Sequence, residues 1–419
     1  MKLSEIIPEI VYNEVYDCGD ETAMYIIDDT ELSLFDDICK KIKERGYTES
    51  DKNIIDGNIS RSFRKDCLIH VYYVPAEKKT RIITDGITCG FNTSPVKSGD
   101  IQPAFFQFEA DHSLIDCGMC YIMLCDDGSF IILDSPHWYS VNDDIRIIEF
   151  LRKLSGEEKP RVSCWLFSHA HEDHIGKFNS LLGYYSDRIK LESVCFNFIS
   201  PGYDAVIKED NMISGTARFR SLLSEHKEIK VIKPHTGMKI CIRNWSFTVL
   251  CTHEDIFPAP VDNFNDTSTV YLAECEGTRI MLPGDASELC DRVLLARYRE
   301  SLSCDIIQIS HHGHSGLSPE FYRRANAACA LFPVTQIKFD EEFGRQESNR
   351  LAVQIAREYY IASNGTAEIP LPYRPGNVTL YPDETFEDFD GIYNLWTYEY
   401  SEEYKNKLYE EFKKNSRTD

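Results

Sequence analysis

The middle of the chain, from about residue 101 to about 375, alternates short apolar runs with stretches of helical periodicity. This alternation predicts strands connected by helices. Six of the apolar runs end directly in polar residues of ligand or catalytic type: FIILDSP (130–136), VSCWLFSHAHEDH (162–174), SFTVLCTHED (246–255), STVYLAE (268–274), RIMLPGD (279–285) and CDIIQISHHGHS (304–315). Functional residues tend to collect on loops at one edge of a rigid sheet, so we expect these strand ends to feed a single site.

The flanking regions have different patterns. Residues 1–98 predict a small α+β unit of unknown role, with strand-like runs over 22–28, 67–74 and 80–85 and a helix from Leu34 to Arg45 that Gly46 ends. His70 alternates with apolar neighbours on one of these strands and is interpreted as structural. Residues 92–100 have linker composition, and 376–419 form an acidic, aromatic C-terminal extension with a predicted terminal helix over 402–414.

Composition narrows the classes of partner. The 419 residues contain 45 Lys and Arg against 68 Asp and Glu, a formal charge of −23. A field of this sign repels polyanions, so we expect a small-molecule substrate and no nucleic acid. No apolar run approaches the roughly 18 residues of a membrane span. The acidic first residues argue against a secretion signal, and a cytoplasmic location is expected.

The cysteines also fit a cytoplasmic location. There are 15, scattered and mostly inside apolar stretches, which favours free thiols over a disulfide framework. Cys117 and Cys120 form a CxxC that could bind metal or do redox chemistry. Its strand-like context, CGMCYIMLC, favours two core thiols instead.

The strongest chemical signal is the segment SHAHEDH, residues 168–174. A strand-like run precedes it, and Ile175, Phe178 and Leu182 follow at helical spacing, so the segment predicts a strand-to-helix turn. His169 and His171 alternate in the turn and can bind one ion, whereas Asp173 and His174 begin the helix and face a second. Imidazole and carboxylate ligands suit zinc, with manganese or iron as alternatives.

HAHEDH resembles the HxHxDH signature of the metallo-β-lactamase superfamily. The resemblance implies an α+β fold, a four-layer αββα sandwich that carries two divalent metal ions at one edge of its sheets. Asp134 resembles the strand-end Asp that steadies the HxHxDH loop from outside the ligand set. Asp285, in Gly284-Asp285, resembles the carboxylate that bridges the two ions.

Two ligand positions stay open. The motif HHGHS resembles the last ligand motif, and His311 is favoured as the ligand because it follows the strand directly; His312 and His314 are then expected to bind substrate or donate protons. The middle His of the family has His253 as first candidate and His235 as second, and a site that lacks this ligand is the third alternative.

The middle part of the chain is also similar to the hydrolase domain of competence (DNA-uptake) proteins and their soluble relatives. Asn265, Asp266 and Ser268 match a pattern that precedes the GD strand there, and Asn265 and Ser268 are expected beside the ligands or at the substrate. It covers residues 101–375 only.

These resemblances imply a binuclear metal-dependent hydrolase. A metal-bridging hydroxide would attack a carbonyl or phosphoryl centre, with Asp173, His312 or His314 protonating the leaving group. A phosphodiester or phosphate-ester small molecule is slightly favoured over a carboxylic ester, lactone or thioester. Two further functional classes remain: a di-iron redox protein, disfavoured by His171 where such members carry Glu, and a non-catalytic metal-binding regulator.

Overall fold

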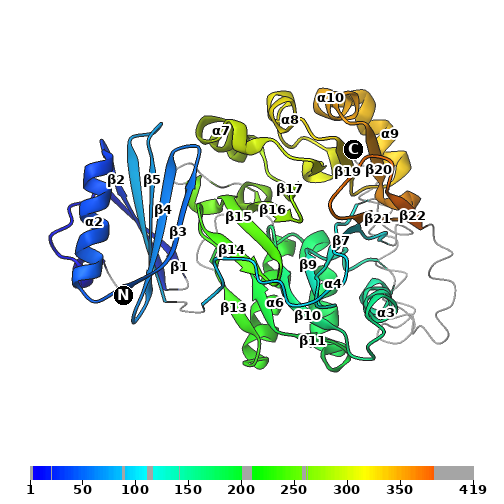
Figure 1. The fold of residues 1–419 in the computed structure, drawn as a ribbon, viewed down its shortest axis with the longest axis horizontal. Helices are drawn as coiled ribbons and strands as arrows, with labels where there is room; N and C mark the ends of the chain where they lie inside the picture. The colour runs from blue at the N-terminus through cyan, green and yellow to red at the C-terminus, as the bar shows by residue number, and fades with distance from the viewer. Residues whose placement is uncertain are drawn as a thin grey trace.

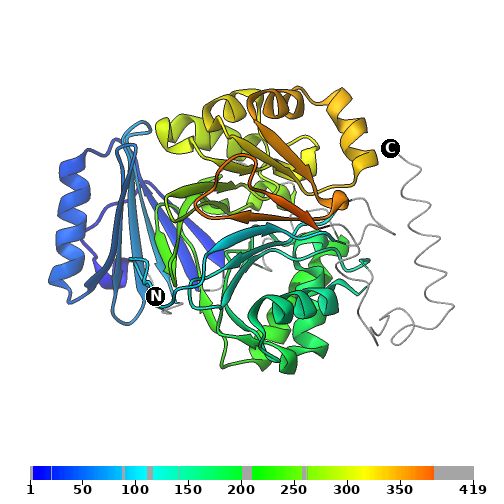
Figure 2. The same cartoon turned by 45° about the vertical axis from the view of Figure 1, so that its right-hand side comes forward.

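Three β-sheets make up the framework of the chain. The structure, a computed structural model, describes residues 3–381 except 20, 87–89, 111–116, 141, 201–209, 257–260 and 262. The first sheet belongs to the N-terminal unit, and the other two face each other in the larger part of the chain (Figures 1 and 2). The predicted helix over 402–414 lies outside the described residues.

The N-terminal unit is a six-stranded antiparallel sheet covered by one helix. Its order is β1-β2-β6-β5-β4-β3, built from β1 (Glu14–Gly19), β2 (Thr22–Ile27), β3 (Thr48–Ile55), β4 (Asn58–Arg64), β5 (Leu68–Val74) and β6 (Lys79–Asp85). Helix α2 (Leu32–Glu44) packs Phe35, Ile38 and Ile42 on one face, where β5 contributes Ile69 and Val71. A short helix, α1 (Leu3–Ile6), precedes the sheet. Strands β1, β3 and β4 were not predicted, because they carry polar residues at many positions.

The second sheet has nine strands and begins the larger unit. Its order is β13-β12-β10-β9-β8-β7-β21-β22, and β11 also pairs with β10. The strands are β7 (Ala104–Gln107), β8 (Tyr121–Leu124), β9 (Phe130–Leu133), β10 (Arg161–Leu166), β11 (Lys190–Leu191), β12 (Ser193–Cys195), β13 (Lys230–Ile232), β21 (Thr366–Pro370) and β22 (Thr379–Tyr381). Because β22 pairs with β21, this sheet continues past the boundary expected at residue 375.

The third sheet has seven strands in the order β14 to β20. They are β14 (Lys239–Ile242), β15 (Trp245–Cys251), β16 (Val270–Cys275), β17 (Thr278–Leu282), β18 (Ile306–Gln308), β19 (Cys329–Phe332) and β20 (Glu358–Ile361). Helices cover the outer faces of both sheets (Figure 1): α3 (Asp143–Ser155), α4 (Glu172–Tyr184) and α6 (Asp210–Glu225) on the nine-stranded sheet, and α7 (Glu288–Arg297), α8 (Pro319–Ala325), α9 (Gln336–Arg345) and α10 (Glu347–Ile355) on the other.

Alternation along the strands separates the layers of this unit. In β9, Ile131 and Leu133 belong to the core between the sheets, whereas Phe130 and Ile132 belong to the core beneath the helices. A strand with apolar residues on both sides is buried on both faces, as a four-layer arrangement requires. The larger unit is therefore a four-layer αββα sandwich, and the chain has the α+β class expected from its sequence.

The N-terminal unit packs on the sandwich through buried polar groups. His70 on β5 donates from Nε2 to the carbonyl of Thr236 at 2.8 Å. His235 donates to Asp85 of β6 at 3.1 Å and to Glu254 at 2.9 Å. On the same interface, Arg297 of α7 pairs with Glu77 at 2.6 Å. The expectation that His70 is structural agrees with these contacts.

Polar residues follow six strands at one edge of the sandwich. They are Asp134 after β9, Ser168 to His171 after β10, Asn197 after β12, His253 after β15, Asp285 after β17 and His311 and His312 after β18. Among the described residues, none of the helices is both long and apolar enough to cross a bilayer.

Candidate metal centre

The HAHEDH segment forms the turn between β10 and α4. His171 is the N-cap residue of α4, with an extended backbone (φ −68°, ψ 153°), so His169 and His171 lie before the helix and Asp173 and His174 in its first turn. Ala170 between them is buried in the core beneath the helix. Burial of Ala170 therefore anchors the turn in the core, whereas the polar side chains on either side of it point to the edge of the sheet.

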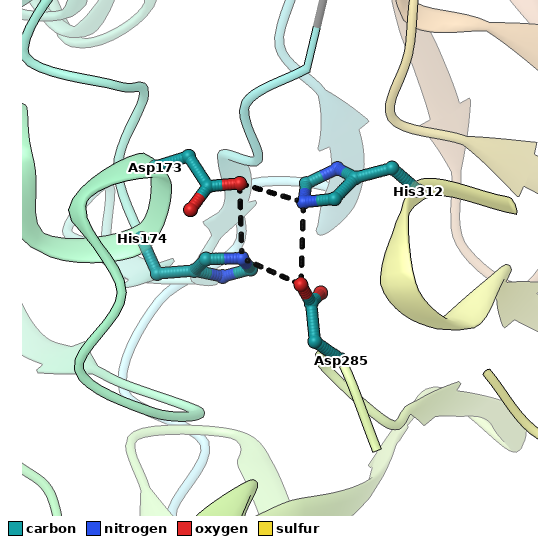
Figure 3. A group of neighbouring side chains, drawn as sticks. All are labelled: Asp173, His174, Asp285 and His312. Carbon is teal, nitrogen blue, oxygen red and sulfur yellow. Dashed lines mark ion pairs between the residues drawn. The ribbon is translucent and has the colours of Figure 1, made fainter. Parts of the chain in front are cut away.

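Four side chains form the first group of potential metal ligands: Asp173, His174, Asp285 and His312 (Figure 3). Asp173 Oδ2 lies 2.9 Å from His312 Nε2 and 3.6 Å from His174 Nε2. Asp285 Oδ2 closes the ring at 3.3 Å from His174 Nε2 and 3.4 Å from His312 Nε2. Donors in a tetrahedral site with bonds of about 2.0–2.1 Å lie roughly 3.3–3.4 Å apart, so this spacing fits one divalent ion.

A second group contains His169, His171 and, again, Asp285. His169 Nε2 lies 2.9 Å from His171 Nδ1 and 3.8 Å from Asp285 Oδ2. Because both groups contain Asp285, its carboxylate stands where a bridging ligand would stand.

Hydrogen bonds from outside the groups fix the orientation of the histidines. His174 donates from Nδ1 to Asp134 Oδ2 at 2.9 Å, and His312 donates from Nδ1 to the carbonyl of Pro333 at 2.8 Å. Both rings therefore turn Nε2 inward, and neither Nε2, nor Asp285 Oδ1, has a hydrogen-bond partner of good geometry. Buried polar atoms without partners are rare, and these donors are the chemistry that a divalent metal requires.

Asp134 occupies the position expected of the steadying carboxylate. It accepts from Ser168 N at 2.8 Å and from Ser168 Oγ at 2.7 Å as well as from His174. Its backbone is left-handed (φ 56°), an unfavourable conformation for a residue with a side chain. Ser168 therefore donates both its backbone amide and its hydroxyl to Asp134, which is a structural role.

The electrostatics of the centre reflect buried charges of opposite sign. Burial lowers the pKa of a histidine, but the carboxylates of Asp285 and Asp173 reverse this at two positions: they raise the pKa of His312 to about 10 and that of His174 well above its usual value. For Asp285 burial acts in the raising direction, yet the same histidines hold its pKa well below the usual range. Without a metal, the first ligand group therefore pairs the protonated imidazoles of His174 and His312 with ionised carboxylates, whereas burial holds the pKa of His169 in the second group well below its usual value.

The structure brings His312, not His311, into the ligand group, which corrects the order expected from the sequence. Both residues are left-handed (φ 49° and 53°) within the turn Ser310–Gly313. Two such residues in succession reverse the chain, so the second side chain points back to the centre. His311 instead lies beside Asn265, with its Nε2 at 3.2 Å from Asn265 Nδ2.

Neither candidate for the middle His reaches the ligand groups, so both expectations are corrected. His253 begins a 3₁₀ turn after β15 and donates to Asn197 Oδ1 at 3.1 Å. His235 is held between Asp85 and Glu254 at the interface with the N-terminal unit. The chain after β15 is used for docking that unit, and within the described residues His169, His171 and Asp285 gain no third histidine.

The remaining predicted residues surround the centre. Asn265 and Ser268 lie in or beside the turn η3 (Phe264–Thr267), close to the second group, and Asp266 bonds Ser287. His314 packs near His311, with ring centres 5.3 Å apart, and its Nδ1 lies 3.5 Å from Glu342. Burial lowers the pKa of His314.

Sequence reasoning missed two neighbours of the centre. The Cys117 thiol donates to Asp173 Oδ2 at 3.6 Å, whereas Cys120 is a buried core thiol as expected. His137 lies 3.8 Å from Glu172, the residue before Asp173. His137 comes three residues after Asp134, so its place behind a strand end was a usable signal. The CxxC spacing of Cys117 was also a usable signal, and the expectation that Cys117 is a core thiol is corrected, because its side chain is only half-buried and contacts Asp173.

No protein-family model and no curated protein sequence matches the chain. Several solved structures are similar to it. The metallo-β-lactamase fold protein YhfI from Bacillus subtilis is 12% identical, with a TM-score of 0.38, over 62% of this chain and 97% of YhfI. Yeast PDE1 in its unliganded form is 13% identical, with a TM-score of 0.41, over 65% of this chain and 100% of PDE1. CmlA, a diiron β-hydroxylase from Streptomyces venezuelae, is 10% identical, with a TM-score of 0.39, over 66% and 55% of the two chains.

Proposed function

We propose that the chain is a binuclear metal-dependent hydrolase that acts on a phosphodiester or phosphate-ester small molecule. The observation that carries the proposal is the pair of ligand groups that share Asp285 at the strand ends of the sandwich. Two bound divalent ions would lower the pKa of water and polarise the bond to be cleaved. Zinc is the first expectation, with manganese or iron as alternatives.

The protein residues would orient and balance this centre. Asp134 and the carbonyl of Pro333 hold two imidazoles with Nε2 inward, which keeps the donors in place before an ion arrives. Asp173 and Asp285 neutralise part of the charge of the ions. The ligand role of His312 removes it as a proton donor. The same argument removes Asp173, which belongs to the first ligand group and whose pKa, despite burial, the neighbouring histidines hold well below its usual value, so His314 is the candidate to protonate the leaving group.

The substrate class rests on the sequence resemblance and on charge. The motifs around Asn265, Asp285 and His312 resemble a subgroup that is associated with phosphodiester chemistry, whereas a net charge of −23 disfavours long polyanions. A small phosphoester satisfies both. Esters, lactones and thioesters are the second choice of substrate, and a non-catalytic metal-binding regulator is the second choice of role.

Metal content and turnover of bis-p-nitrophenyl phosphate, measured on the same preparations, test the proposal. We expect about two ions per chain and diester turnover in the wild type, and both reduced in Asp285→Asn, which keeps the side-chain shape. Asp340→Asn, an exposed residue on α9, is the matched control and should behave as wild type. Two ions with turnover only on carboxylic esters would reassign the substrate. Protein without metal, never exposed to chelator, would refute the hydrolase.

A further inference from the structure

The two ligand groups are unequal. The first offers four donors, two of them carboxylates, whereas the second offers two imidazoles and shares Asp285. Within the described residues, no other His, Cys, Asp or Glu joins His169 and His171 with all ligand atoms inside 4.8 Å. An ion in the second group would therefore need a further donor of another residue type.

The segment that lies against the second group carries buried oxygens without partners. Asn265 Oδ1, Ser268 Oγ and Thr269 Oγ1 are buried and have no hydrogen-bond partner. The Phe264 ring stands edge-on to His171, with ring centres 5.6 Å apart. On the other side, a Cβ built on Gly284, the residue before Asp285, would lie 3.6 Å from Ser268 Oγ. The segment thus lies between two members of the group.

Local hydrogen bonds hold this segment rigidly. Asn263 caps the turn by accepting from Asn265 N at 2.7 Å. Thr267 Oγ1 donates to the carbonyl of Phe264 at 2.6 Å, and Thr269 N donates to the carbonyl of Ser168 at 2.8 Å. An oxygen that stays unpartnered in so ordered a segment costs free energy unless it binds a ligand.

Asn265 is the donor best suited to a metal. Its Nδ2 donates to His311 Nε2 at 3.2 Å, and His311 in turn donates from Nδ1 to the carbonyl of Ser315 at 3.2 Å. These two hydrogen bonds identify which end of the Asn265 amide is the nitrogen and leave Oδ1 as the atom without a partner. Amide oxygens are ordinary metal ligands, whereas the Ser268 and Thr269 hydroxyls bind divalent ions weakly when neutral.

We propose that Asn265 Oδ1 completes the second metal site, positioned by His311, and that the two ions bind in sequence with unequal affinity. The inference rests on the proposed binuclear centre. It assigns separate tasks to the adjacent histidines: His312 binds at the first site, and His311 holds the amide of the second. The first ion enters the site with two carboxylates. The second meets fewer charges and the repulsion of the first.

Titration of the metal-free protein with Zn²⁺ against a chromophoric chelator tests this inference without an activity measurement. The wild type should bind two ions in steps that differ at least about tenfold in affinity. Asn265→Ala should weaken only the second step, by about tenfold or more, because loss of even an indirect partner of a metal costs about 10–100-fold. Asn265→Asp keeps the shape, adds a charge and should tighten the second step.

Asn364→Ala is the matched control, an exposed asparagine that bonds Gln336, and should leave both steps unchanged. Circular dichroism of each metal-free variant checks the fold, and the aspartate variant decides if the alanine variant does not fold. Two ions in the wild type, with a second step that neither Asn265 variant alters, would overturn the inference and leave the binuclear hydrolase intact. A wild type that binds fewer than two ions would overturn both.

Discussion

Removal of the Arg297 guanidinium should loosen the N-terminal unit from the sandwich. Arg297, at the end of α7, is almost fully buried (4% exposed). It pairs with Glu77 of the N-terminal unit at 2.6 Å and with Asp255 of the sandwich at 2.5 Å, and it lies over the Tyr72 ring. The substitution Arg297→Met keeps much of the aliphatic stem and removes the charge together with the N–H groups that donate to Glu77 and Asp255.

The expected cost follows from what the substitution leaves behind. Breaking a buried ion pair by removing one partner costs about 3–5 kcal/mol, because the other charge stays buried. Asp255 keeps other donors, since the Tyr72 hydroxyl donates to it at 2.6 Å and Thr252 N at 3.1 Å. Glu77 keeps its contact with Arg81. We therefore expect the lower end, about 3 kcal/mol.

Urea unfolding followed by tryptophan fluorescence and by circular dichroism measures this cost as the change in free energy of unfolding. Arg292→Met is the matched control: it lies on the same helix, and its pair with Glu288 is exposed, so its loss should cost at most about 0.5 kcal/mol. If Arg297→Met costs no more than Arg292→Met, the buried network does not hold the two units together.

Three further outcomes follow from the site and its surroundings. His312 has a pKa of about 10 in the metal-free protein and must lose its proton to bind an ion. The affinity for zinc should therefore rise from pH 6 to pH 7, and binding should release protons. An affinity that does not change with pH would refute this. Burial lowers the pKa of His235, but Glu254 and Asp85 outweigh it and raise this pKa from 6.5 to about 9. Protonated His235 therefore stabilises the fold fully below pH 6.5, and this contribution of about 3 kcal/mol is lost as the pH rises through 9. Urea unfolding should show this decline in the free energy of unfolding for the wild type and a flatter one for His235→Gln. His253→Ala should keep two ions by elemental analysis, whereas His171→Ala should keep one.

Much of the metal centre was visible in the sequence because its parts are local. HAHEDH is a strand-to-helix turn, so its spacing alone places four donors on one short segment. Asp134 and Asp285 each follow an apolar strand, and strand ends meet at one edge of a sheet. The burial of most cysteines and the helix at 32–44 followed from apolar periodicity in the same way.

The tertiary structure decided what depends on backbone conformation and on contacts between distant segments. His311 and His312 differ in which of them reaches the ligand group, and this follows from the left-handed backbone of both residues. The pattern of side chains in the sequence does not reveal that backbone conformation. His235 and Glu254 pair with each other at the interface with the N-terminal unit, because a buried charge is stable only beside an opposite charge. They are therefore not available as metal ligands. The proposed ligand role of Asn265 depends on its place beside His171 and His311, which lie 94 and 46 positions away in the chain. Periodicity reports which face of an element is buried, whereas a ligand set depends on which loops the fold brings together.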